Sequence, residues 1–256
     1  MRKLRMKTLA LTLLLMLPVL VSAQEDNKSQ AYWVHEDVVK PGMAGEYESV
    51  CQELLGHLKT HNIQGTGWIT TSTADSRYLF VSPISDMSDV GKSPFPELAE
   101  KMGADEMGAL FGKMDKCYDV EHDYVIHLDK ELSYMPAGIT QTPEGQNYRK
   151  FHYLYVTPSN RAAVNEKMKA LKDMFASKGS KVDYRVYKSG FGTRGEFLMV
   201  AVAAKDPVDY AQKGAANQEL MGEDGQKMMS ELWENLLKYE EIVGQMRPDM
   251  AYSPSN

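Results

Sequence analysis

Apolar and polar positions along the chain alternate between two spacings, and both halves of the chain show the same order of spacings. Residues 32–39 are rich in aromatic and β-branched side chains, which predicts a strand that Pro41 and Gly42 end. The next segment has apolar residues three or four positions apart, which predicts a helix with one buried face. That face comprises Met43, Tyr47, Val50, Cys51, Leu54, Leu55 and Leu58. Residues 68–71 and 77–84 then predict a hairpin.

The rest of the first half predicts a second helical region over residues 95–123, interrupted at its glycines, and a strand over 125–134. The second half repeats this order. The pattern predicts strands over 148–156, 184–188 and 196–203, a helix over 161–178 and a helical region over 209–241. Residues 137–147 lack apolar periodicity and carry glycine and proline, which is typical of a linker.

Short sequence matches between the halves indicate an internal duplication. Leu-Ser-Tyr-Met-Pro at 132–136 matches Met-Ala-Tyr-Ser-Pro at 250–254, at an offset of 118 residues. Residues 34–41 match 151–158 at an offset of 117, which superposes His35 on His152. We therefore predict two repeats, 32–136 and 148–254, joined by the linker 137–147.

The element order β-α-β-β-α-β, read twice, is that of the ferredoxin-like motif. With two copies in tandem, the chain resembles the dimeric α+β barrel superfamily, which includes antibiotic-biosynthesis-type monooxygenases, NIPSNAP-like proteins and chlorite-dismutase-like haem proteins. The resemblance implies an α+β fold in which two tandem ferredoxin-like repeats form an intramolecular dimeric α+β barrel. Helices would cover the outside, and the two sheets would enclose a cavity. The resemblance concerns the fold and implies no specific activity.

Charge and the N-terminal segment restrict location and partners. Residues 1–23 carry four basic residues and then an apolar run over 9–21 that ends in Val-Ser-Ala, which predicts a signal peptide cleaved after Ala23. An uncleaved anchor is the alternative. No cysteine follows Ala23, so we expect no lipid anchor, a short flexible segment at 24–31 and a periplasmic or secreted protein. The net charge of −6 argues against a nucleic-acid partner. We expect no membrane contact after cleavage, and a monomer or a homodimer.

Candidate ligand-binding residues follow from strand alternation. If the apolar residues Val39, Leu154 and Val156 face the helices, the opposite face of the two first strands points into the barrel. We therefore predict that the cavity is lined by residues from that face together with aromatic residues that begin the second strands of each half. These candidates are Glu36, Tyr153, Tyr155, Trp68 and Tyr184. Aromatic side chains near Arg185 suit an organic anion or a planar ligand.

The duplicated pair His35 and His152 is a further candidate, because imidazoles can bind a metal, grip an anion or transfer a proton. Alternation points both away from the cavity, and local hydrogen bonding is the alternative role. His57 and His61, four residues apart, have a zinc-compatible spacing but no accompanying signature, so we predict no metal site. No histidine occurs in residues 161–178 or 209–241, where the resemblance implies that a haem ligand would lie. We therefore expect no cofactor, and no haem.

Two cysteines, Cys51 and Cys117, both fall in the helical regions of the first repeat. A disulfide between them and two buried thiols are both compatible with the sequence. No nucleophile elbow, phosphate-binding loop or dinucleotide fingerprint is present, so whether the protein is an enzyme stays open. The leading hypothesis is an exported protein that binds a small apolar or aromatic ligand in the barrel. A cofactor-independent monooxygenase or isomerase and an interaction module with a filled barrel are the alternatives.

Overall fold

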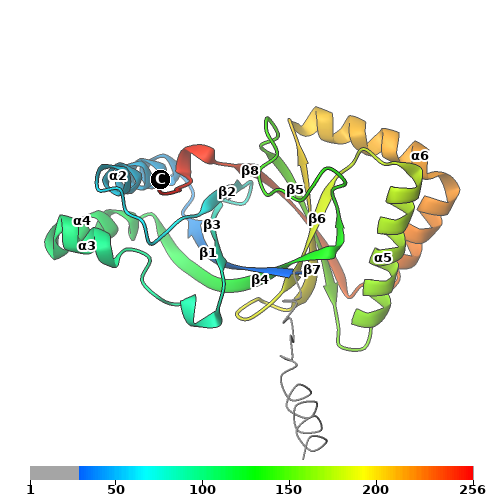
Figure 1. Ribbon diagram of the computed structural model, residues 1–256, viewed down its shortest axis with the longest axis horizontal. Helices are drawn as coiled ribbons and strands as arrows, with labels where there is room; N and C mark the ends of the chain where they lie inside the picture. The colour runs from blue at the N-terminus through cyan, green and yellow to red at the C-terminus, as the bar shows by residue number, and fades with distance from the viewer. Residues whose placement is uncertain (1–28, 256) are drawn as a thin grey trace, which may run out of the picture.

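The protein is built around a closed eight-stranded barrel (Figure 1). The structure is a computed structural model that describes residues 29–255. The strands are β1 (Ser29–Val39), β2 (Ile69–Thr73), β3 (Arg77–Ile84), β4 (Tyr118–Tyr134), β5 (Tyr148–Val156), β6 (Tyr184–Ser189), β7 (Glu196–Ala204) and β8 (Lys238–Met246). They close in the order β1-β3-β2-β8-β5-β7-β6-β4, and every pairing is antiparallel. Closure gives each of the eight described strands a neighbour on both sides.

The barrel consists of two four-stranded halves with the same topology. The first half runs β4-β1-β3-β2 and the second runs β8-β5-β7-β6. They join where β2 pairs with β8, at Thr71 opposite Met246, and where β4 pairs with β6, at Leu128 opposite Tyr187. The predicted duplication and the α+β fold class are therefore confirmed.

Helices cover the outside of each half and lie at opposite ends of the molecule, with the barrel between them (Figure 1). The first half carries α2 (Ala44–Thr60), α3 (Pro96–Met102) and α4 (Ala104–Met114), and the second carries α5 (Arg161–Lys178) and α6 (Pro207–Trp233). One apolar core lies beneath each helical layer, and a third fills the barrel. Among residues 29–255, no helix is long and apolar enough to span a membrane.

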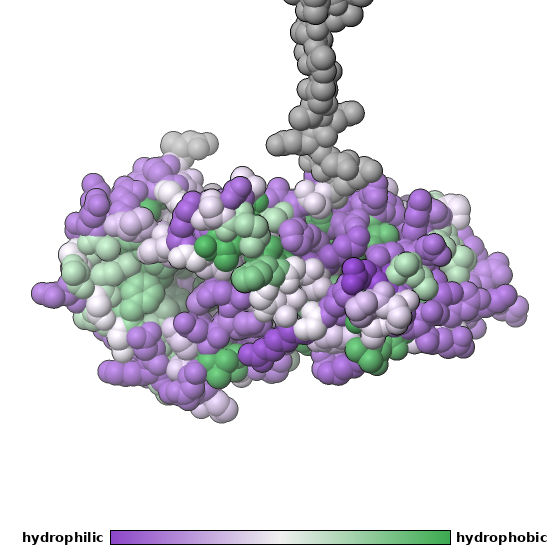
Figure 2. All heavy atoms as spheres, turned by 90° about the horizontal axis from the view of Figure 1, so that it is seen from below, coloured by the Kyte–Doolittle hydropathy of each residue, from purple (hydrophilic) through white to green (hydrophobic). Residues whose placement is uncertain are grey.

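The surface seen in Figure 2 is mostly hydrophilic, and an apolar area lies at the end of the molecule that α2, α3 and α4 occupy.

Local sequence features account for the ends of several helices. Asp206 caps α6 by accepting hydrogen bonds from the backbone N–H groups of Val208 and Asp209. Gly103 separates α3 from α4 with a φ of 88°, a conformation that favours glycine.

Two predicted boundaries are wrong. The helical region over 95–123 ends at Met114, and β4 begins at Tyr118. The region over 209–241 ends at Trp233, and β8 begins at Lys238. Both strands begin with charged residues: β4 with Asp119 and Glu121, and β8 with Lys238, Glu240 and Glu241. The apolar alternation that identifies a strand is therefore absent at these ends.

The last residues of each half pack against the other half. Tyr252 pairs with Trp68 of the first half, and its hydroxyl shares its one proton between the carbonyls of Leu58 and Ile63, at 3.2 and 2.7 Å. Tyr134 correspondingly pairs with Tyr184 of the second half, and its hydroxyl donates to the Ser180 carbonyl at 3.2 Å. The two contacts are related by the duplication and tie the halves together.

Candidate functional site

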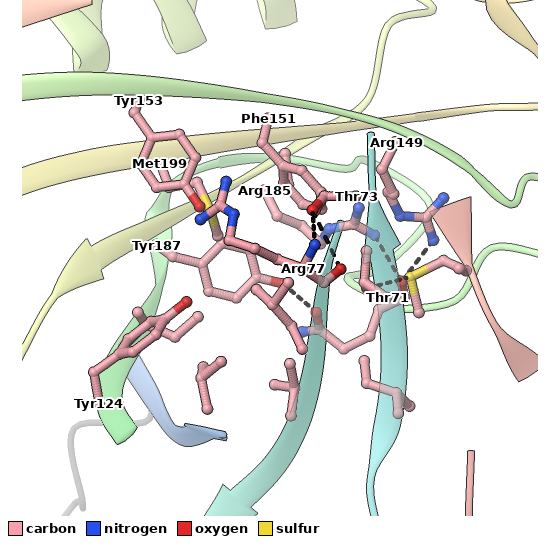
Figure 3. Close-up of a pocket in the computed structure, with 18 of the residues that line it drawn as sticks. Thr71, Thr73, Arg77, Tyr124, Arg149, Phe151, Tyr153, Arg185, Tyr187 and Met199 are labelled. Carbon is pink, nitrogen blue, oxygen red and sulfur yellow. Dashed lines mark hydrogen bonds between the residues drawn. The ribbon is translucent and has the colours of Figure 1, made fainter. Parts of the chain in front are cut away.

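A cavity of about 60 Å³ lies inside the barrel (Figure 3). Its walls come from both halves and from the linker, because residues at alternate positions of each strand point inward. The lining residues are Val34, Ile69, Thr71, Thr73, Arg77, Leu79, Val81, Tyr124, Ile126, Gln141, Arg149, Phe151, Tyr153, Arg185, Tyr187, Phe197, Met199, Ala201 and Met246. Most of them are apolar or aromatic, and three are arginines.

One of the three arginines, Arg77 on β3, has carboxylate partners. Its Nη2 lies 2.9 Å from Asp75 Oδ2, and its Nη1 lies 3.4 Å from Glu36 Oε2. Tyr124 also donates a hydrogen bond to Glu36, at 3.1 Å. The charge of Arg77 is therefore compensated at its own end of the barrel.

Arg149 on β5 and Arg185 on β6 have no such partner. Their exposed fractions are 1% and 2%, and no carboxylate of residues 29–255 lies within 4 Å of either guanidinium. Backbone carbonyls receive their hydrogen bonds instead. Arg149 donates to the carbonyls of Gln141 and Tyr148, each at 3.0 Å, and to that of Gln146. Burial and the neighbouring charge of Arg185 lower the pKa of Arg149 to about 9.

Arg185 is incompletely satisfied. Its Nη1 donates to the carbonyls of Thr140 and Gln141 at 2.7 and 3.2 Å. Its Nε is buried and makes no hydrogen bond within the described part of the chain. A buried, charged donor without an acceptor is costly, and native structures usually supply a partner. The two arginines thus form a positively charged region of the wall with a free donor.

The linker, residues 137–147, forms the wall that holds these arginines. Gln141 donates from Nε2 to the Tyr32 hydroxyl at 3.0 Å, and its Oε1 accepts a hydrogen bond from Tyr187. Burial raises the pKa of Tyr187 to about 12, so its hydroxyl stays a neutral donor at physiological pH. The segment predicted as a mere connection therefore contributes to the interior.

The structure places the sequence candidates on both sides of the sheet. Tyr153 lines the cavity, as alternation along β5 predicts. Glu36 also lies inside the barrel, 7% exposed, where it compensates Arg77 without lining the cavity itself. Tyr155 points to the same face and lies 6.3 Å from the Tyr153 ring, centroid to centroid, beyond the cavity.

Trp68 and Tyr184 do not line the cavity, and that prediction is wrong. Trp68 packs beneath the helices of the first half, and Tyr184 packs beneath those of the second. The alignment of the two residues with each other is nevertheless correct, since they make the equivalent contacts with Tyr252 and Tyr134. The predicted inward orientation was wrong because residues at the beginning of these strands face the helices.

His35 and His152 also lie on the outer face and do not approach the cavity. His152 lies between two tyrosines, with Nδ1 2.6 Å from the Tyr239 hydroxyl and Nε2 3.1 Å from the Tyr210 hydroxyl of α6. His35 lies beside Asp37 and Asp123. Cys51 and Cys117 are both buried as free thiols in the core under α2, so the structure has no disulfide between them.

Sequence reasoning missed Arg149, Gln141 and Phe151. Arg149 and Phe151 could have been predicted by the argument that identified Tyr153, because positions 149, 151 and 153 point to the same face of one strand. The position of Gln141 could not be predicted, because an irregular segment has no periodicity that would show where its side chains point.

Haem does not fit this interior. A cavity of about 60 Å³ is far smaller than the 300–1,000 Å³ typical of small-molecule sites, and no histidine lines it. Of the described helices of the second half, neither carries a histidine that could serve as axial ligand. No residue of the cavity wall carries an imidazole or a thiol.

Comparison with known proteins identifies the architecture. No family model matches the sequence, and no curated protein matches it. Among solved structures, an anthrone oxidase-like protein superposes with a TM-score of 0.54 at 14% identity, over 85% of this chain and 91% of its own. A proposed monooxygenase from Fusobacterium nucleatum subsp. nucleatum gives a TM-score of 0.53 at 11% identity, over 86% and 93%.

A second proposed monooxygenase, from Lactobacillus acidophilus, gives 0.50 at 6% identity, over 85% and 94%. Weaker structural neighbours include a haem-binding protein from Thermus thermophilus, with a TM-score of 0.41, and a chlorite dismutase from Candidatus Nitrospira defluvii, with 0.46. At these identities the likeness concerns the fold alone. The chain therefore has the fold of the dimeric α+β barrel proteins, with both halves of the barrel supplied by one polypeptide.

Proposed function

We propose that the protein binds a small organic carboxylate inside its barrel. The observation that carries this proposal is the pair Arg149 and Arg185, buried side by side without a carboxylate partner among residues 29–255. Charged groups taken out of water usually pair with an opposite charge, because isolated burial costs several kcal/mol per ion. A carboxylate in the cavity would supply the opposite charge and an acceptor for the free Nε of Arg185.

The existing hydrogen bonds support this proposal. Backbone carbonyls of the linker solvate the two guanidinium groups but carry no net charge, so the like charges still repel each other. The linker therefore holds the two guanidinium groups in position before a ligand binds. Preorganised donors of this kind increase affinity because binding then needs little rearrangement.

The volume of the cavity restricts the ligand further. A water needs roughly 10–15 Å³ of such space, so about 60 Å³ holds about four water-sized groups. A carboxylate with a short apolar chain, such as acetate or propionate, fits this space. Phe151 and Ala201 lie in the wall beside the arginines and suit that apolar chain. An aromatic acid such as benzoate would require the linker to move.

Isothermal titration calorimetry and thermal denaturation test the proposal with formate, acetate, propionate and benzoate. Acetamide, which has the shape of acetate without its charge, is the control ligand. We expect acetate or propionate to bind and to raise the melting temperature, and acetamide to have no effect. At a hundredfold excess over the dissociation constant, the stabilisation is about 2.7 kcal/mol.

Arg185→Met and Arg149→Met should each abolish the response to the carboxylates. Arg161→Met is the matched control, because Arg161 is an exposed arginine on α5 that pairs with Glu196. It should bind like the unmodified protein. Carboxylate binding that survives both cavity substitutions, or equal binding of acetamide, would refute the proposal.

We also propose that the protein acts outside the cytoplasm. The basic and then apolar pattern of residues 1–23 supports this, and that segment lies outside the described residues. N-terminal sequencing of the protein from its source should begin at Gln24. A mature protein that begins at Met1 would contradict export by cleavage.

A further inference from the structure

A cluster of charged residues on the outer face of the barrel has no role in the interior site. His35 and Asp37 on β1 lie opposite Asp123 and Glu121 on β4, as direct cross-strand pairs. One nitrogen of His35 and one carboxylate oxygen each of Asp37 and Glu121 all lie within 4.8 Å of one another. The site is open to solvent, because Glu121 is exposed and His35 has 35% of its side chain exposed. We propose that these three residues bind a divalent transition-metal ion such as Zn²⁺.

The first reason is the state of Asp37. This residue is only 2% exposed, and among residues 29–255 its Oδ1 makes no well-aligned hydrogen bond and has His35 as its charged neighbour. Its other oxygen, Oδ2, accepts a hydrogen bond of 2.5 Å from Tyr47 of α2. The tyrosine therefore fixes the carboxylate with Oδ1 directed toward His35, whose Nε2 lies 3.3 Å away.

The duplication shows that the fold does not require this acid. The second half has Leu154 where the first has Asp37, and Leu154 is part of the apolar core under α5 and α6. Glu121 likewise corresponds to Tyr239, since Leu154 pairs with Tyr239 as Asp37 pairs with Glu121. Of the three proposed ligands, only the histidine has an identical counterpart in the second half. A buried acid at a position that elsewhere takes leucine calls for a partner that stabilises its charge.

The second reason is the orientation of His35. Its Nδ1 lies 3.0 Å from Asp123 Oδ1, and the same oxygen accepts a hydrogen bond of 2.8 Å from the Trp33 indole. An ionised carboxylate only accepts hydrogen bonds, so His35 Nδ1 carries a proton and donates it. Nε2 is the atom left to face Asp37. A histidine that donates one N–H to a carboxylate and presents its other nitrogen is the usual arrangement of a metal ligand.

The spacing suits zinc after a small side-chain movement. Ligand atoms about 2.1 Å from a tetrahedral ion lie about 3.4 Å apart, which matches the 3.3 Å between His35 Nε2 and Asp37 Oδ1. Glu121 is exposed, and its carboxylate oxygen lies within 4.8 Å of the other two ligand atoms, so a change of its side-chain torsions can bring it to the ion. One imidazole and two carboxylates with an open fourth position favour zinc over calcium or magnesium, which take oxygen ligands.

The competing arrangement is an ion pair between protonated His35 and the two aspartates, with no metal. In that case the Nε2 proton occupies the place of the ion. Competition between Zn²⁺ and a chromophoric chelator distinguishes the two, with metal-stripped protein and Zn²⁺ as the only added ion. We expect one ion per chain, and a visible spectrum typical of tetrahedral coordination when Co²⁺ replaces Zn²⁺.

Four substitutions sharpen the test. Glu121→Gln changes an exposed residue, so it should fold normally and lower zinc affinity by about tenfold or more. His35→Gln should abolish measurable binding, and Asp123→Asn, which changes a positioning residue, should lower affinity by about 10–100-fold. Asp37→Leu introduces the residue of the second half and should abolish binding. It also leaves the buried Tyr47 hydroxyl without its acceptor, so the unfolding midpoint of the metal-free protein should fall.

His152→Gln and the double variant His57→Gln/His61→Gln are the controls, because they remove three of the five other histidines, including the pair with a zinc-compatible spacing. Both should bind like the unmodified protein. Absence of stoichiometric binding, or binding that persists in His35→Gln, would overturn the proposal, and so would loss of binding in the His57/His61 variant. The cavity arginines lie on the other face of the sheet, so carboxylate binding should stay unchanged in Glu121→Gln.

Discussion

Removal of the Tyr252 hydroxyl tests how strongly the C-terminal segment ties the two halves together. In Tyr252→Phe the ring still fits against Trp68, whose centroid lies 5.6 Å away, while the bonds to the carbonyls of Leu58 and Ile63 are lost. Tyr252 is 4% exposed, so water does not freely replace them. The hydroxyl has a single proton, which the two carbonyls share, so at about 0.5–1.5 kcal/mol for a net hydrogen bond we expect a loss of about 1 kcal/mol.

Tyr252→Ala removes the ring as well. Truncation of a large buried aromatic residue costs about 3–5 kcal/mol in a protein core, so this variant should lose clearly more than Tyr252→Phe. Tyr134→Phe is the matched variant of the other half and loses one bond of 3.2 Å, so we expect about 1 kcal/mol.

Urea denaturation, followed by tryptophan fluorescence and by far-ultraviolet circular dichroism, measures these differences. The three tryptophans, Trp33, Trp68 and Trp233, report on both halves. If the barrel is one cooperative unit, both probes should give the same midpoint in every variant. A Tyr252→Phe variant as stable as the unmodified protein would refute the reasoning. So would a Tyr252→Ala variant in which only the first half unfolds.

Three further predictions follow from the described contacts. Gln141→Ala removes the hydrogen bonds to Tyr32 and Tyr187. Amide hydrogen exchange in residues 137–147 should therefore be faster than in the unmodified protein, while exchange in β5 should change less. Burial raises the pKa of Cys51 to about 12, so a thiol reagent at pH 8 should modify Cys51 only after denaturant unfolds the protein. Burial lowers the pKa of His152 below 6.5, so the unfolded chain binds its proton first as the pH falls. The protein should therefore lose stability below about pH 6.5 through this residue, and the difference from His152→Gln should shrink across that range.

The sequence was sufficient for the fold because the duplication and the element order constrain each other. Alternation along β5 placed Tyr153 in the barrel, and the alignment of Tyr134 with Tyr252 matches two equivalent contacts between the halves. The strand boundaries of β4 and β8 were missed because charged residues at the start of each strand disguise the alternation.

The site was harder to predict because its chemistry depends on what is missing around a residue. A sequence shows that Arg149 and Arg185 exist, but only the tertiary structure shows that no carboxylate approaches them. The same holds for Asp37, whose buried and unbonded oxygen depends on the packing of Tyr47 against β1. Gln141 contributes through an irregular segment, whose path depends on the strands that it covers.

A crystal structure of the protein with acetate tests the central claim most directly. The account predicts one acetate inside the barrel, with a carboxylate oxygen about 2.9 Å from Arg185 Nε and a second contact to the Arg149 guanidinium. It also predicts that the linker carbonyls of Thr140 and Gln141 keep their bonds to Arg185. A barrel interior that holds only water at saturating acetate, or acetate bound only on the outer surface, would contradict the account.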